Sequence, residues 1–310
     1  MIKARLLIQQ LALMLMVALC APFALAESQN TTSLAPQSST IENKGFLWKV
    51  SDSNSSIYLL GSVHFANADY YPMSGAISTA FKASDTLAVE VDISNLDPTR
   101  TQQLLLHMGN YQDQRTIKDE LSPQTYQKLE TYLANARLPI RLVEKQKPGM
   151  LIMSLTSLEL AKLGMSPEFG IDQHFLKLAK GNKPVVELET LQQQLDLLLN
   201  MEDPDQAMTQ ALEEFPTFPE LAHKLFSAWQ SGDTTQMEQL LIDEPLQKHP
   251  ESKAFFDKMF TERNLTMSEK IKGYLAEDST VFVVIGAGHL IGEQGIVSLL
   301  KEAGFETQRH

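Results

Sequence analysis

Cysteine is almost absent from this sequence, with Cys20 the only one in 310 residues. Lys3 and Arg5 precede an unbroken apolar stretch, residues 11–26, that ends in a small-x-small sequence. This pattern predicts a signal peptide, residues 1–26, cleaved after Ala26, and the alternative is an uncleaved anchor. Since Cys20 would leave with the signal, the mature chain would have no disulfide, no thiol nucleophile and no thiolate metal site.

Lipid attachment to Cys20 is not expected either. A lipoprotein signal needs a small residue immediately before the acylated cysteine, and Leu19 occupies that position. The sequence therefore predicts a periplasmic or secreted protein without a lipid anchor.

Positive charge and long apolar runs are also scarce. The chain has 26 Lys and Arg against 38 Asp and Glu, a net charge of −12, and signal cleavage would remove two more cations. Such an acidic surface disfavours nucleic acid as a partner. No stretch after residue 26 is apolar for long enough to cross a bilayer, so no stable membrane span is expected after cleavage. A peptide or small-molecule substrate is the expected partner, and nothing in the sequence indicates an oligomeric state.

The rest of the chain divides into a linker and one domain. Residues 27–44 are rich in Ser, Thr, Gln and Asn, which predicts a disordered linker. Residues 45–310 alternate between strand and helix patterns, which predicts an α/β (or α+β) fold with a central mixed sheet flanked by helices. The expected strands are 46–50, 57–60, 85–92, 183–190, 280–285 and a short one at Phe305; the expected helices include 122–136, 149–162, 170–181 and 292–303. Residues 191–277 are helical throughout and are expected to form a cap over the carboxyl edge of the sheet, where a cap would exclude water and select substrates.

Two similar motifs each follow a short apolar run. Gly61-Ser62-Val63-His64 follows residues 57–60, and Gly286-Ala287-Gly288-His289 follows residues 281–285. Each run reads as a buried strand that ends in glycine and delivers a histidine three residues later, just past the carboxyl end, where open α/β sheets bind ligands. If the two strands are neighbours, both imidazoles reach one site.

Glu90, at the end of a third predicted strand, is expected to join them. Two imidazoles and a carboxylate are usual ligands of a divalent ion where thiolates are absent, and three ligands leave a position open for water. An ion there would polarise a carbonyl and acidify water, which gives hydrolysis. Without metal, the same three groups could act as base, orienting acid and electrophile. Taken singly, each histidine could instead be satisfied by a carbonyl or carboxylate, and Glu90 could be a cap or surface group.

With these motifs the chain resembles the TraB/GumN family, which is grouped with the pheromone-shutdown proteins and the Tiki membrane proteases. Members have two Gly-x-x-His motifs near the ends of the domain and an acid on an early strand, places filled here by His64, His289 and Glu90. Three weaker features are also similar: Gly170-Ile171-Asp172, Glu187-Leu188-Glu189-Thr190 and Arg263-Asn264. The resemblance covers residues 46–305.

The resemblance implies a fold similar to that of erythromycin esterases and haem-binding ChaN-type proteins. For the Tiki branch it implies a peptidase that uses Mn²⁺ or Co²⁺, with Zn²⁺ a further candidate. Carried onto this sequence, it makes His64, Glu90 and His289 the catalytic and metal-binding residues. Unlike members of that branch, this chain is expected to have no carboxy-terminal membrane anchor.

Asp172, Glu187 and Arg263 are candidate substrate-binding residues. The Arg263 guanidinium could hold a substrate carboxylate, or the acids of the site, in a bidentate contact. The alternative for Arg263 is a structural ion pair with Glu262 or Glu187.

The predicted function is therefore an exported metal-dependent hydrolase that acts on peptide bonds. Two alternatives come from other classes. One is a protein that uses the same histidines to bind haem or a small ligand without turnover, and the other is a non-catalytic interaction protein in export or polysaccharide assembly.

Overall fold

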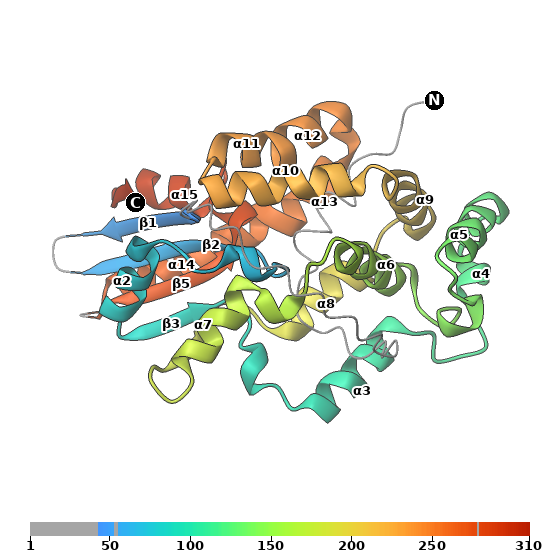
Figure 1. The fold of residues 1–310 in the computed structure, drawn as a ribbon, viewed down its shortest axis with the longest axis horizontal. Coiled ribbons are helices and arrows are strands. Elements are labelled where there is room, and N and C mark those ends of the chain that lie inside the picture. The colour runs from blue at the N-terminus through green and yellow to red at the C-terminus, as the bar shows by residue number, and fades with distance from the viewer. Residues whose placement is uncertain (1–42, 53–54, 278) are drawn as a thin grey trace, which may run out of the picture.

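Six strands form one sheet in the computed structural model, which describes residues 43–52, 55–277 and 279–310 (Figure 1). The order across the sheet is β4-β3-β5-β2-β1-β6. Their bounds are β1 Phe46–Ser51, β2 Ser56–Ser62, β3 Thr86–Val89, β4 Val185–Glu187, β5 Val281–Gly286 and β6 Glu306–Arg309. The predicted signal peptide and most of the predicted linker lie outside the described residues. The last two linker residues are described: Asn43 forms a β-bridge with Met73, and the Lys44 backbone N–H donates to the Gln230 carbonyl at 2.9 Å.

The sheet is mixed, as predicted. Neighbouring strands β2, β5, β3 and β4 run parallel, whereas β1 is antiparallel to both β2 and β6. All residues of β5 are buried, and its sequence is a continuous apolar run that ends in glycine. Such a run is typical of a parallel strand covered on both faces, so β5 lies near the middle of the sheet.

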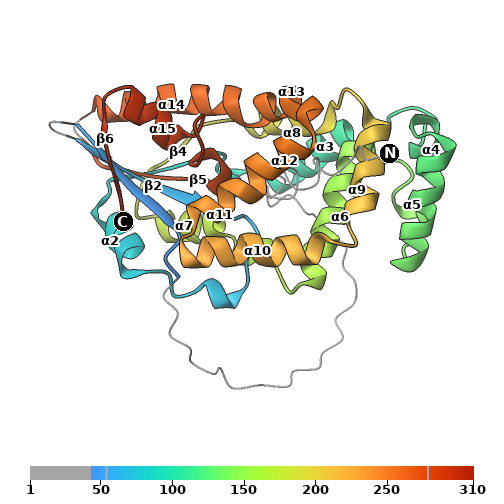
Figure 2. The ribbon, with the colours of Figure 1, turned by 90° about the horizontal axis from the view of Figure 1, so that it is seen from above.

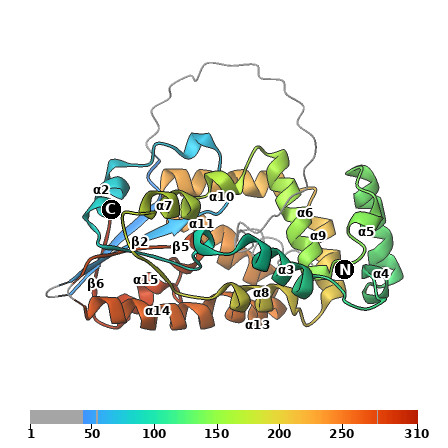
Figure 3. The same ribbon diagram turned by 90° about the horizontal axis from the view of Figure 1, so that it is seen from below.

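Helices cover both faces of the sheet. Figures 2 and 3 show α2 (Gly75–Ala83) and α7 (Ile171–Ala179) on one face, and α14 (Glu262–Leu275) and α15 (Ile296–Glu302) on the other. Aromatic contacts fix the first face, since the Phe175 ring of α7 lies 4.9 Å from that of Phe282 on β5. Helix α15 begins four residues later than predicted, because Gly292 has a φ of +82°, which a right-handed helix excludes.

The remaining helices come from two insertions, each of which starts where a parallel strand ends. The first, between β3 and β4, contains α3 (Pro98–Gly109), α4 (Ile117–Glu120), α5 (Pro123–Asn135) and α6 (Pro148–Lys162). The second, between β4 and β5, contains α8 (Leu191–Leu199), α9 (Pro204–Glu214), α10 (Phe218–Ser231), α11 (Thr234–Glu238), α12 (Glu244–Lys248), α13 (Lys253–Phe256) and then α14. In Figure 1, α6, α8 and α9 gather beyond the carboxyl edge of the sheet, with α4 and α5 further out.

The cap therefore differs from the predicted one in composition. Residues 191–277 are largely helical as expected, but α14 runs back along a sheet face, and helices of the first insertion pack on α8 and α9. Both insertions leave the sheet at the same edge because parallel strands share their carboxyl ends there.

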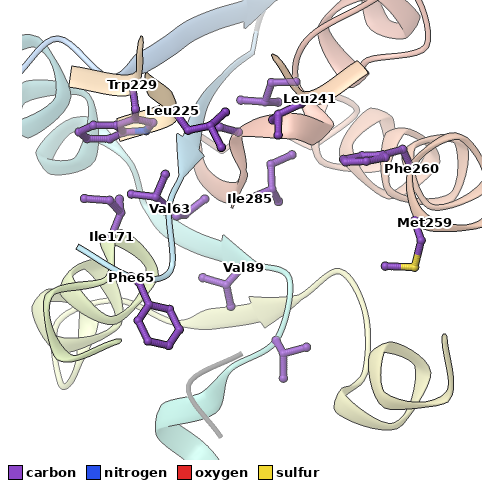
Figure 4. Close-up of a cluster of buried hydrophobic side chains, with 14 of the residues drawn as sticks. Val63, Phe65, Val89, Ile171, Leu225, Trp229, Leu241, Met259, Phe260 and Ile285 are labelled. Atoms are coloured by element: carbon purple, nitrogen blue, oxygen red, sulfur yellow. The ribbon is translucent and has the colours of Figure 1, made fainter. Parts of the chain in front are cut away.

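Apolar side chains of the cap close over the strand ends. Figure 4 shows Leu225 and Trp229 of α10 beside Val63, and Leu241 beside Ile285. The Trp229 indole N–H also donates to the Gly61 carbonyl oxygen at 2.7 Å, so its one polar group is satisfied although the side chain is fully buried. These contacts hold the cap at a fixed position over β2. None of the helices in the described part of the chain has the length and apolar character needed to span a membrane.

Candidate functional site

Strand register brings the two histidine motifs together. Ser62 at the end of β2 pairs with Gly286 at the end of β5, and on the other side of β5 Val89 of β3 pairs with Val284. His64, His289 and Glu90 follow these three adjacent strand ends. They line one small cavity together with Leu241, Phe260, Arg263, Gly286, Ala287 and Gly288.

Gly286 lies at the centre of this cavity wall. A β-carbon added there would lie 3.3 Å from Glu90 Oε1, 3.5 Å from His289 Cδ2 and 4.0 Å from His64 Nε2. The three side chains thus converge on one backbone position that carries no side chain of its own. The cavity offers about 10 Å³ to the centre of a water-sized sphere, which is room for one water molecule or one ion.

His64 is oriented by a carboxylate. Its Nδ1 lies 2.6 Å from Asp172 Oδ2, and the Ser62 hydroxyl donates to Asp172 Oδ1 at 2.9 Å. Burial lowers the pKa of His64, but the charge and hydrogen bond of Asp172, with a smaller contribution from Glu90, outweigh this, so the pKa lies above 6.5. With Nδ1–H facing Asp172, the second ring nitrogen, Nε2, is left without a proton in the neutral imidazole.

The Gly170-Ile171-Asp172 segment is what places this carboxylate. The Ile171 N–H donates to the Val63 carbonyl oxygen at 2.9 Å, so the start of α7 is tied to the chain just before His64. A β-carbon on Gly170 would lie 2.3 Å from the His64 carbonyl oxygen, a distance that no relaxed structure allows. Gly170 is therefore required by this close approach of two backbones.

We expect Gly170→Ala to lower the free energy of unfolding by about 1–3 kcal/mol, because the clash is with backbone and one of the two segments must move. Gly273→Ala is the matched control: that helical glycine has nothing within 4 Å of the added β-carbon, so alanine should raise stability by about 0.5–1 kcal/mol. Urea unfolding of both variants measures the difference. Equal stability of Gly170→Ala and wild type would contradict the close approach.

His289 is held by an amide. Its Nδ1 lies 2.5 Å from Asn264 Oδ1, while Asn264 Nδ2 donates to the Gln294 carbonyl oxygen at 2.8 Å. This second bond assigns Oδ1 as the acceptor, so Nδ1 of His289 carries the proton and Nε2 does not. Burial, and then the charges of Arg263 and His64, hold the pKa of His289 well below 6.5. His289 is accordingly a neutral imidazole at pH 7.

Glu90 accepts three hydrogen bonds. Gly286 N–H donates to Oε1 at 2.6 Å, and Oε2 accepts from Gln194 Nε2 at 2.8 Å and from an Arg263 terminal nitrogen at 3.0 Å. Arg263 also donates to both oxygens of Glu189, at 2.8 and 2.6 Å. The alternatives for Arg263 were a bidentate contact, with a substrate carboxylate or with the acids of the site, and a structural ion pair with Glu262 or Glu187. The structure shows the bidentate contact with acids of the site.

The Arg263 network is buried. Glu90, Glu189 and Arg263 are each no more than 8% exposed. Burial raises the pKa of Glu189, but the hydrogen bonds and charge of Arg263 outweigh it and hold that pKa below its ordinary value. The charges of this network therefore depend on one another.

Two of the candidates do not line the cavity: Asp172, which contacts it only through His64, and Glu187. The Glu187 side chain is exposed and accepts a hydrogen bond from the Asp92 backbone N–H at 2.7 Å. Glu189 has the inner position instead, because the hydrogen-bond ladder continues past β4: Glu189 N–H donates to the Glu90 carbonyl oxygen at 2.8 Å.

Four side chains that act at this site had no role in the sequence interpretation: Ser62, Glu189, Gln194 and Asn264. Ser62, Glu189 and Asn264 lie inside motifs that the sequence analysis had identified. Those motifs therefore contained more residues of the site than the ones predicted from them. Gln194 carried no signal, since it is one of three successive glutamines at the start of α8.

The two histidines suit a divalent ion. Metal-bound histidines usually have their other ring nitrogen against a carboxylate or carbonyl, and here His64 Nδ1 lies against Asp172 Oδ2 and His289 Nδ1 against Asn264 Oδ1. Glu90 suits it less well, because three hydrogen bonds leave about one of the four acceptor sites of its carboxylate free. In agreement, no group of three or more His, Cys, Asp or Glu side chains is placed to hold a metal within residues 43–310 as far as they are described. The fit is thus to two nitrogen ligands, with the other positions left to water or substrate.

The sequence model of the TraB/PrgY/gumN family matches residues 46–309. The chain belongs to this family. The predicted membership is confirmed, and the match covers the whole domain, from β1 to β6.

Two relatives are similar over most of their length. Both are called uncharacterized protein YbaP. The chain is 26% identical to that of Escherichia coli K12 over 250 residues, which is 80% of this chain and 89% of the relative. It is also 26% identical to that of Shigella flexneri over 246 residues, 79% and 87% respectively. No solved structure matches the chain. The α/β class is therefore established by the sheet itself and not by a structural neighbour.

Proposed function

We propose that the chain is an exported, metal-dependent hydrolase that acts on peptide bonds at the cavity between His64 and His289. The observation that supports this most directly is the pair of Nε2 atoms. Within the described residues, neither Nε2 has a hydrogen-bond partner from the chain, and both rings line a cavity with room for one ion or one water.

The ion would be held by His64 Nε2 and His289 Nε2. When bound, it would polarise the substrate carbonyl and acidify a water molecule. Asp172 and Asn264 keep both rings in the tautomer that presents Nε2, so the ligands are oriented before the ion arrives. Export follows from the predicted signal peptide, residues 1–26.

Glu90 and Arg263 have separate roles in this proposal. Glu90 Oε1, which accepts only the Gly286 N–H, has the free acceptor site that takes a proton from the attacking water and returns it to the leaving amine. Arg263 lines the same cavity and places a fixed positive charge near the oxygen that becomes negative in the transition state. Leu241 and Phe260 close the cavity on the cap side and keep bulk water out.

The metal-free alternative uses the same residues differently. His64, with its pKa raised, would itself take the proton from water, and His289 Nε2 would accept a hydrogen bond that orients that water.

Elemental analysis of the protein from Glu27 to His310, purified without chelator, tests the proposal. We expect about one Mn, Co or Zn per chain, hydrolysis of members of a peptide library, and loss of both in the His64→Ala/His289→Ala double variant. The circular dichroism spectrum of the double variant should be unchanged, because both side chains border a cavity.

Three outcomes decide between the readings. Metal that is lost with the histidines, together with hydrolysis, supports the proposal. If metal-free protein hydrolyses peptides and chelator does not inhibit it, the proposed role of the metal is overturned and His64 is left as the general base. No hydrolysis beyond that of the double variant, with or without added ions, overturns the enzymatic function.

A further inference from the structure

A second, larger hollow lies beside the catalytic cavity. We call it the α8–α14 groove. It has a volume of about 780 Å³ and is lined by side chains from two stretches of the chain, residues 188–210 and 252–270. This volume is typical of sites for small organic ligands. Arg263 lines both the groove and the catalytic cavity, so the two are separated by the buried Arg263–Glu189 pair.

The groove carries excess negative charge. Its lining includes five acids and three bases, and each base already has an acceptor. Arg263 holds Glu189 and Glu90, Lys258 pairs with Glu202 at 2.6 Å, and Lys270 donates to the Leu188 carbonyl oxygen at 2.6 Å.

Three acids of the lining have no ion-pair partner in the described part of the chain: Asp196, Asp203 and Glu262. They come from α8, the cap of α9 and α14, so they border the groove from different elements. The charge that would complement this lining is positive.

Apolar side chains provide the rest of the surface. Leu197, Met201 and Phe255 are partly exposed in the groove, and methionine adapts to ligands of different shape. The groove therefore combines apolar contacts with acids that have no ion-pair partner among the described residues.

We infer that the α8–α14 groove binds a short peptide segment that carries a positive charge. Its cationic group lies among Asp196, Asp203 and Glu262, and its apolar side chains contact Met201 and Phe255. The link to catalysis rests on the proposed function: a segment bound here lies beside the catalytic cavity, on the other side of the Arg263–Glu189 pair. The cation is either a free amino terminus or a lysine or arginine side chain.

Calorimetric titration of the His64→Ala protein tests this without cleavage of the probe. Four tetrapeptide amides are used: Lys-Ala-Leu-Ala with an acetylated amino terminus, the same peptide with norleucine or with Glu in place of Lys, and the norleucine peptide with a free amino terminus. We expect at least one cationic peptide to bind about tenfold more tightly than the acetylated norleucine peptide, and the Glu peptide to bind weakest. The two cationic peptides distinguish a side-chain cation from an amino terminus.

Variants identify the groove as the binding site. Asp196→Asn/Glu262→Gln should reduce the preference for the cationic peptide about three- to tenfold, since two exposed charge interactions are lost. Glu269→Gln is the matched control, because it removes one exposed acid of α14 that pairs with Lys272 and lies outside the groove lining.

Equal affinity of the cationic and neutral peptides, or a preference that Asp196→Asn/Glu262→Gln leaves unchanged, overturns the inference. The proposed function fails separately. If binding in the groove depends on charge but wild type hydrolyses nothing, only the proposed function is overturned. If wild type hydrolyses peptides but binds them without a charge preference, only the inference about the groove is overturned.

Discussion

Alanine at His64 should lower kcat for peptide hydrolysis by about 10²- to 10⁴-fold, the range that positioned proton-transfer and ligand groups contribute. The fold should survive, because the side chain borders a cavity and Asp172 keeps its hydrogen bond from Ser62. Steady-state rates on a peptide identified by the library screen measure the effect. Wild-type kcat in His64→Ala would remove His64 from the reaction.

Asp172→Asn is the informative companion to this variant. The amide keeps the shape of the carboxylate but not the charge that raises the pKa of His64, so in chelator-treated protein His64 should titrate at lower pH than in wild type. The shift, followed by NMR of the imidazole, reports the contact even if activity is small. A pKa of His64 that is the same in both proteins would contradict the role of Asp172.

Methionine at Arg263 should cost about 3–5 kcal/mol of unfolding free energy, because it leaves Glu90 and Glu189 buried without their cation. Chemical denaturation at pH 7 measures this loss. The control is Arg263→Met with Glu90→Gln and Glu189→Gln. It has no buried charge in the network and should recover much of the stability. A single variant as stable as wild type would show that the network carries little charge when folded.

The pH dependence gives a second check on the same network. The pKa of Glu189 is lowered in the folded protein. The ionised Glu189 therefore stabilises the fold at pH values above the ordinary carboxyl pKa of about 4.3, and this stabilisation is lost as pH falls through the lowered pKa. In Arg263→Met the pH dependence of stability has the opposite sign. Burial without a cation raises the pKa of Glu189, so the variant should regain stability relative to wild type as pH falls.

The strand ends and their histidines could be predicted from local pattern. A buried parallel strand is nearly continuous in apolar residues. Gly286 is the last residue of β5 and Gly61 the next-to-last residue of β2, so the two glycines mark the carboxyl edge in the sequence itself. Glu90 follows from the same rule on β3. These residues are close in the structure because the carboxyl ends of adjacent parallel strands lie at one edge of the sheet. Their proximity therefore follows from the strand topology alone.

The choice among acids within one motif could not be made from sequence. Glu187 and Glu189 are two residues apart and would share a face in a regular strand. What separates them is the course of the chain after β4, where Glu189 continues the ladder beside Glu90 and Glu187 accepts the Asp92 N–H. This depends on the neighbouring strand and not on the motif.

The sequence by itself predicted the export signal and was enough to identify the α/β class, the family, and the candidate site residues His64, Glu90 and His289. Each of these depends on local composition or on residues next to a strand end. Only the tertiary structure decided which partner each group has. Asp172, Asn264 and Arg263 come from α7 and α14, which lie far along the chain and meet the strand ends only when the helices pack on the sheet. The α8–α14 groove is likewise a property of packing, because its walls belong to separate helices whose distance no local pattern fixes.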